Sequence, residues 1–171
     1  MRFWILVLGV LLSQTRVFAA DDFDDEYDAK SWREVEVRLP VAPKAASLLP
    51  FYVSAVTTNR FFVDGSSIEV GADGVVRYVL VVLSGEGAKN VTFEGMRCET
   101  RERRIYAAGR SDGSWVKFKN NQWDKIRDAV GNRHHAALFL EYFCPGGNVV
   151  RDTTEAINWL KKGGYAPSGG V

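Results

Sequence analysis

The sequence lacks most of the patterns that identify enzymes and cofactor-binding proteins. It contains no Gly-x-Ser-x-Gly elbow, no phosphate-binding glycine loop and no dinucleotide-binding glycine fingerprint. Its only histidines are His134 and His135. Because adjacent helix positions point about 100° apart, these two side chains cannot share one metal face. We therefore expect no metal site and no cofactor.

A strong charge of either sign is also missing. The chain has 22 Lys and Arg against 21 Asp and Glu. A chain so close to neutral is not expected to be a general nucleic-acid binder.

Only one long apolar run occurs, from Phe3 to Leu12, after the basic residue Arg2. Polar residues follow, and then Val17-Phe18-Ala19, which places small side chains where a signal peptidase cleaves. The run is about half the length that a membrane-spanning helix needs. We therefore predict a signal peptide over residues 1–19, cleavage after Ala19, export to an oxidising compartment and no transmembrane segment in the mature chain.

Cysteine is scarce, and no Cys-x-x-Cys pair is present, so a redox role is not expected. The two cysteines are Cys98 and Cys144, and an even number in an exported chain predicts a disulfide. The loop that this bond closes would stabilise the fold by at most about 4 kcal/mol in the chain-entropy model.

The mature chain divides into three predicted segments. Residues 20–31 carry six acidic side chains and one lysine, which is typical of a flexible leader. Residues 32–164 have the apolar content of one folded domain, and residues 165–171 form a short flexible tail.

A strand-like pattern extends from residue 51 to residue 118. The stretch Val75 to Leu83 is the most apolar, with Arg77 as its only charged residue, so we expect a central strand covered on both faces. Asp-Gly pairs predict tight turns at 64–65, 73–74 and 112–113.

Two further strands are predicted with less regular patterns. Residues 34–39 alternate charged and apolar side chains, as an edge strand does. In residues 91–99 the apolar side chains change from odd-numbered to even-numbered positions around Gly95. We therefore predict a one-residue bulge at that glycine, which would return them to one face.

Helical spacing appears only after the strands. It predicts a short helix within 123–130 and a longer one from His134 to Phe143, with Ala136, Phe139, Leu140 and Phe143 on its buried face. A last helix begins at Asp152 and ends before Gly163. Strands followed by helices predict an α+β domain: a twisted antiparallel sheet with two or three mainly C-terminal helices packed on one face.

Four segments resemble a known family in their order and spacing. They are Glu94 to Thr100, Arg104 to Gly109, Asp112 to Trp115 and Leu138 to Cys144. They are similar to the cryptic neisserial protein family, small exported proteins of proteobacteria, and the similarity extends over roughly residues 32–163. The resemblance implies a periplasmic bacterial protein and implies no reaction and no catalytic residue.

The one site-like pattern is basic, because residues 89–133 contain eleven Lys and Arg against six Asp and Glu. Strand parity places Arg104, Tyr106 and Arg110 in one exposed row. Arginine beside an aromatic ring binds carboxylates and phosphates. We therefore predict a non-catalytic binding module for an anionic envelope component or an acidic protein. Its binding residues are Arg97, Arg104, Tyr106, Arg110, Trp115 and Lys117.

Three alternatives to this prediction stay open. The same side chains are ordinary cross-strand neighbours on a solvated sheet face, and the acidic leader could dock on them within the chain. The protein could also be a hydrolase of an envelope polymer, for which we assign no catalytic residue. A triad of Ser111, Asp112 and His134 could be assembled in three dimensions but has no sequence motif behind it. A hydrolase requires a concave pocket with converging titratable groups.

We predict that the exported protein begins at Ala20 and contains no free thiol. The intact mass of protein purified from the periplasm should lack residues 1–19 and should increase by two hydrogens on reduction. An uncleaved N-terminus, or two thiols that react without prior reduction, would contradict both export and the crosslink.

Overall fold

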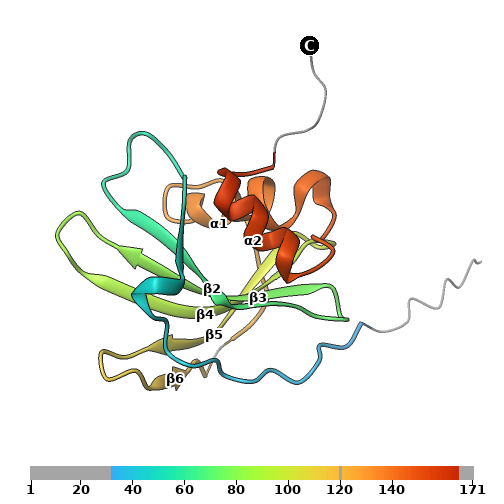
Figure 1. The fold of residues 1–171 in the computed structure, drawn as a ribbon. Helices are drawn as coiled ribbons and strands as arrows, with labels where there is room; N and C mark the ends of the chain where they lie inside the picture. Colours follow the sequence, from blue (N-terminus) through green and yellow to red (C-terminus); the bar gives the residue numbers. More distant parts are fainter. Residues whose placement is uncertain (1–31, 120, 166–171) are drawn as a thin grey trace, which may run out of the picture. The chain divides into compact units, whose positions relative to one another are not determined.

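The computed structural model describes residues 32–119 and 121–165, and within these it contains one antiparallel sheet (Figure 1). The strands pair in the order β1-β2-β3-β4-β5-β6, and β7 pairs with β5 beside β6. Their bounds are β1 Leu48–Phe51, β2 Arg60–Val70, β3 Val75–Leu83, β4 Lys89–Arg97, β5 Glu102–Gly109, β6 Trp115–Lys117 and β7 Asp124–Lys125.

The helices lie mainly at the C-terminal end of the described chain and cover one face of this sheet (Figure 1). They are η1 Ala45–Ser47, α1 Arg133–Ala137, η2 Leu138–Phe143, η3 Pro145–Gly147 and α2 Thr153–Lys162. The predicted α+β class, with an antiparallel sheet and C-terminal helices, is therefore confirmed. None of the helices in the described residues is long and apolar enough to cross a membrane.

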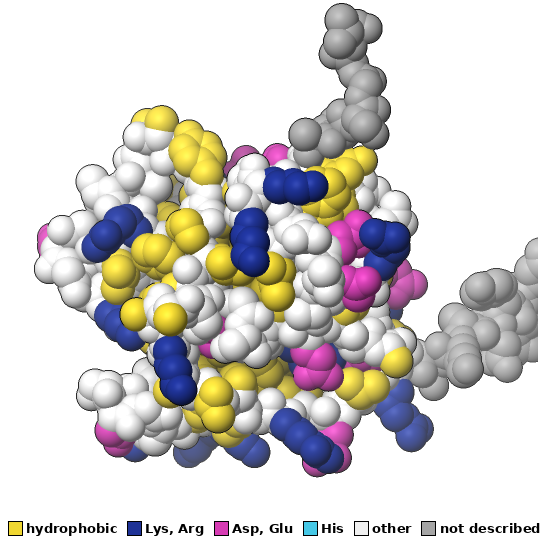
Figure 2. All heavy atoms as spheres, viewed as in Figure 1, with side chains coloured by type: hydrophobic (Ala, Val, Ile, Leu, Met, Phe, Trp, Pro, Cys, Tyr) yellow, Lys and Arg dark blue, Asp and Glu magenta, His cyan; other side chains and the backbone are white. Residues whose placement is uncertain are grey.

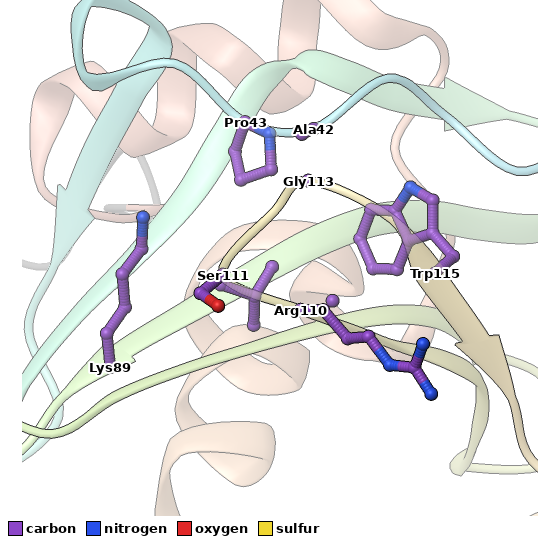
Figure 3. A pocket seen from close by; sticks show the side chains of 9 residues that line it. Ala42, Pro43, Lys89, Arg110, Ser111, Gly113 and Trp115 are labelled. Atoms are coloured by element: carbon purple, nitrogen blue, oxygen red, sulfur yellow. The ribbon is translucent and has the colours of Figure 1, made fainter.

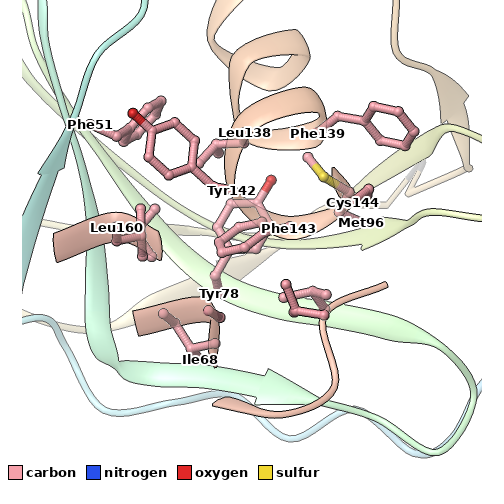
Figure 4. Packing of buried hydrophobic residues seen from close by; sticks show 14 of the residues in the cluster. Phe51, Ile68, Tyr78, Met96, Leu138, Phe139, Tyr142, Phe143, Cys144 and Leu160 are labelled. Carbon is pink, nitrogen blue, oxygen red and sulfur yellow. The ribbon is translucent and has the colours of Figure 1, made fainter. Parts of the chain in front are cut away.

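The central strand β3 is buried on both faces, as its composition predicts. Tyr78 and its alternate neighbours face the main core, which lies between the sheet and the helices (Figure 4). Val79 and Val81 face a smaller second core on the opposite side of the sheet. The second core needs a cover of its own, because α1, η2 and α2 lie on the opposite side of the sheet in Figure 1.

The second face is covered by residues 32–43, which we call the strap. The predicted edge strand over residues 34–39 is wrong, because this part of the strap does not pair with a strand of the sheet. Its inward-facing side chains include Glu34 and Val37, while Val35 and Leu39 are more than a third exposed. A two-residue period therefore misplaces the apolar side chains of this segment.

The predicted turn at Asp64-Gly65 is wrong, because β2 continues through it. The Asp64 carboxylate is buried and accepts hydrogen bonds from the backbone and hydroxyl of Ser66, at 3.0 and 2.7 Å. These local bonds accompany a register shift against β3, so the Asp-Gly pair marks an irregularity within a strand. The turns at Gly74 and Gly113 are confirmed, with φ of 73° and 84°.

The predicted bulge at Gly95 is also wrong, since β4 pairs with β3 without interruption. The extra residue is Tyr106 in β5, which has no partner between the pairs Phe93–Ala107 and Glu94–Ile105. The change of parity in β4 has another cause: Phe93 enters the second core, and later residues of the strand enter the main core.

The helix predicted from His134 to Phe143 is present, but it widens into the π-helical segment η2. The wider turn is marked by the Cys144 amide, which donates to the Phe139 carbonyl five residues earlier, at 3.0 Å. Tyr142 is consequently buried, and Leu140, predicted to be inside, is 48% exposed. The short helix predicted within 123–130 is wrong, because β7 and irregular chain occupy that region.

The last helix and the crosslink agree with the predictions. The Asp152 carboxylate accepts from the Glu155 amide at the start of α2, and Gly163 ends the helix with a φ of 84°. Cys98 and Cys144 form a disulfide with Cα atoms 5.4 Å apart. It joins the end of β4 to the end of η2, so it holds the helical layer to the sheet.

Candidate binding site

The strap lies on the sheet through contacts at several points along its length. The Trp32 indole nitrogen donates to the Asp73 carbonyl at 2.8 Å, and the Val35 amide donates to the Asp73 carboxylate at 3.0 Å. Near the other end, the Trp115 indole donates to the Pro40 carbonyl at 2.8 Å. Val37 packs against the second core between these two ends.

The strap also supplies a carboxylate to the sheet. Glu34 accepts from Arg104 at 2.5 Å, from the Tyr106 hydroxyl, and from Arg77 at 3.4 Å. We call Arg77, Arg104 and Tyr106 the carboxylate clamp. Gly95 lies between the clamp strands, and a Cβ atom there would stand 2.3 Å from the Tyr106 hydroxyl. A glycine is therefore required for the tyrosine to reach Glu34.

The clamp arginines have further partners of their own. Arg77 is 1% exposed and donates two hydrogen bonds to the Asp73 carboxylate, at 2.6 and 3.2 Å. Burial alone would raise the pKa of Asp73, but these bonds and the arginine charge outweigh it and lower that pKa. Arg104 also donates to the Asn121 side chain at 2.9 Å. Most of the positive charge of the clamp is thus neutralised within the chain.

The exposed row predicted from strand parity is therefore wrong for two of its members. Arg104 and Tyr106 do share a face, but Tyr106 is only 6% exposed, and the Arg104 side chain is 24% exposed. The strap covers both, which a pattern within the strand could not reveal. Arg110, the third member of the row, is exposed beyond the end of β5.

The other predicted residues separate into different surroundings. Arg97 lies over the Trp32 ring, 4.1 Å from its centroid, and forms an ion pair with Glu99. Lys117 is exposed on β6. Arg110 and Trp115 come together at an open cleft beside the end of the strap (Figure 3).

This cleft has a volume of about 320 Å³ and combines charge with apolar surface. Lys89 and Arg110 are exposed cations that line it, and Pro43 and Trp115 provide apolar surface (Figure 3). Val91 adds a further apolar side chain to the lining. Its full lining is Ala42, Pro43, Lys89, Val91, Gly109, Arg110, Ser111, Gly113 and Trp115. Lys89 was not among the predicted binding residues, because its approach to the β5–β6 turn depends on strand register.

Charge on the visible surface is mixed. In Figure 2, Lys and Arg side chains are spread among acidic and apolar ones and do not form one continuous basic field. This distribution agrees with the near-zero net charge of the sequence. The cations at the cleft are therefore local and do not belong to a larger basic surface on this face.

A second polar cluster, which no sequence motif predicted, lies inside the main core. Glu94 is 1% exposed and accepts from the Tyr78 hydroxyl at 3.1 Å and from the Thr92 hydroxyl at 2.7 Å. Its carboxylate also lies 2.8 Å from Nε2 of the buried His135. One sequence feature could have indicated its burial. Glu94 lies two residues before the buried Met96 in β4, so the two side chains share one face of the strand.

The two histidines have structural surroundings. The His134 ring stacks on Phe61 with centroids 5.3 Å apart and lies 4.0 Å from the His135 ring. Burial, followed by the neighbouring His135 charge, lowers the pKa of His134 to about 4. Burial would raise the pKa of Glu94, but the charge and hydrogen bond of His135 lower it to about 2.

The hypothetical triad is not assembled among the described residues. Ser111 lines the cleft, whereas the Asp112 carboxylate accepts from the amide and hydroxyl of Ser114 in the β5–β6 turn. His134 packs against Phe61 instead. The described part of the chain also holds no group of three His, Cys, Asp or Glu side chains that could bind a metal.

The fold and the cleft define an antiparallel-sheet domain with helices on one face and an N-terminal strap on the other. Residues 27–161 match the CNP1-like family, so the chain belongs to that family. A relative from Neisseria gonorrhoeae (strain ATCC 700825 / FA 1090), named cryptic neisserial protein 1, is 29% identical over 162 residues. The match covers 84% of this chain and 79% of the relative. No solved structure matches the chain.

The lowered pKa of His134 predicts a loss of stability in acid. Unfolded His134 gains a proton as the pH falls through 6.5, whereas the folded residue resists protonation until about pH 4. The free energy of unfolding is therefore unaffected by protonation of this residue above pH 6.5. It decreases by on the order of 2–3 kcal/mol as the pH falls towards 4. Glu94 adds a further loss of stability only when the pH falls below 4.5, the ordinary pKa of its side chain.

Urea unfolding between pH 7 and pH 4 measures this effect. The variant His134→Phe keeps a ring against Phe61 and removes the titrating group, so its free energy of unfolding should fall less over the same range. Equal pH dependence in the two proteins would contradict the assignment.

Proposed function

We propose that this protein is an exported, non-catalytic binding module that holds the anionic group of an envelope component or acidic partner in the cleft. The observation that carries the proposal is a cleft lined by two exposed cations, with Arg110 near the Trp115 ring and Lys89 at the other end (Figure 3). The signal-peptide pattern of residues 1–19 supports export to the periplasm, and the disulfide is compatible with an oxidising compartment.

The chemistry of the rim fits a carboxylate or phosphate. In the described residues neither Lys89 nor Arg110 forms an ion pair, in contrast to Arg77 and Arg104 in the clamp. Arg110 does lie near Asp112 and helps to lower the pKa of that exposed carboxylate, after the hydrogen bonds from Ser114. A guanidinium fork and an ammonium each bind an oxyanion, while the indole ring accepts an apolar or planar neighbour.

The predicted binding residues Lys117 and Arg97 do not line the cleft, and in this proposal they lie outside it. Lys117 is exposed on β6 and adds positive charge near the cleft, whereas Arg97 is engaged by Trp32 and Glu99. The hydrolase hypothesis finds no favouring observation at the cleft, because no histidine lines it.

The test uses two anions of different chemistry, a fluorescent polyglutamate peptide and inorganic polyphosphate. Both cleft cations are replaced in Lys89→Ala/Arg110→Ala. We expect that binding of at least one probe weakens about 10-fold or more, because each lost charged contact is worth about 1.5–3 kcal/mol at best. The salt dependence of the remaining binding should also be shallower.

The matched control is Arg127→Ala/Lys161→Ala, which removes two exposed cations that do not line the cleft. It has the same net charge as the test variant, so it separates the cleft from general electrostatic attraction. Equal loss in both variants, or no loss in either, would contradict the proposal.

A further inference from the structure

The strap is attached to the sheet by side chains more than by backbone. Within the described residues, no backbone–backbone hydrogen bond joins residues 32–43 to a strand. Its anchors are the Trp32 indole, the Glu34 carboxylate, the Val37 side chain, the Val35 amide and the carbonyl of Pro40, and the two backbone groups pair with side chains of the sheet and its turns. Detaching a segment held in this way costs less free energy than detaching a strand that is held by backbone hydrogen bonds to its neighbour.

Release of the strap would leave the rest of the fold in place. The sheet ladders, the main core and the Cys98–Cys144 disulfide do not include strap residues. Release would uncover the clamp residues Arg104 and Tyr106 and the apolar side chains of the second core, such as Phe93. That face would then present positive charge beside apolar surface, and it would require another occupant.

The strap itself shows what this occupant must offer. The clamp binds a carboxylate, the second core accepts a valine three residues later, and Trp115 donates to a carbonyl six residues after the carboxylate. These three features are met by an extended peptide that carries a glutamate. They are not met by a phosphate group or a sugar alone.

We propose that the sheet face beneath the strap binds an extended, glutamate-bearing peptide segment of a partner protein, and that the strap is its intramolecular competitor. This inference rests on the proposed binding function and specifies the class of acidic partner. A tethered strap acts at an effective concentration in the millimolar range, so a partner peptide reaches the face only when the hold of the strap weakens. Glu34 is the contact that sets this competition.

The experiment uses a fluorescent peptide with the sequence of residues 32–43 as the probe, added to the purified exported protein. The variants Glu34→Ala and Glu34→Gln weaken the strap in the chain while leaving the clamp intact. We expect both variants to bind the probe about 10-fold more tightly than the wild type, measured by fluorescence anisotropy. Retention of the near-ultraviolet circular dichroism verifies that each variant is folded.

Two controls connect the effect to the clamp. Adding Arg104→Ala to Glu34→Gln should remove the gained affinity, and a probe with glutamine in place of its Glu34 should not bind. Equal or absent probe binding in the wild type and both Glu34 variants would overturn the inference. That outcome would leave the cleft proposal standing, because the cleft test depends on Lys89 and Arg110.

Discussion

The structure depends on one constraint: β3 is apolar on both faces, so both faces of the sheet must be covered. The helices and the disulfide supply one cover. The other cover is the strap, which combines the apolar contact of Val37 with the carboxylate of Glu34. Burying Arg77 in the central strand is tolerable only because Asp73 and Glu34 accept its hydrogen bonds.

Much of the fold follows from local pattern. The central strand, the turns at Gly74 and Gly113, the capped last helix and the cysteine pair all depend on short-range chemistry or on composition. The errors arose where a local signal has two structural solutions. Asp64-Gly65 forms an irregularity within a strand, and the parity change near Gly95 reflects two cores instead of a bulge.

The candidate site was predictable only in part. Which segment covers a sheet face, and in which register two strands pair, both depend on contacts between residues far apart in the sequence. Strand parity correctly placed Arg104 and Tyr106 on one face, but it could not show that Glu34 would reach them across about seventy residues of sequence. Lys89 joins Arg110 and Trp115 at the cleft through strand pairing that no motif records. The buried cluster of Glu94 and His135 likewise required the docking of α1 onto the sheet.

The ion pair between Glu34 and Arg104 is the contact on which the attachment of the strap to the sheet most depends. A double-mutant cycle with Glu34→Gln, Arg104→Gln and the combined variant measures this contact directly by urea unfolding at neutral pH. The account predicts a coupling free energy of about 1.5–3 kcal/mol, as for hydrogen bonds between charged groups. A coupling near zero would contradict it, because the strap would then be held without its carboxylate.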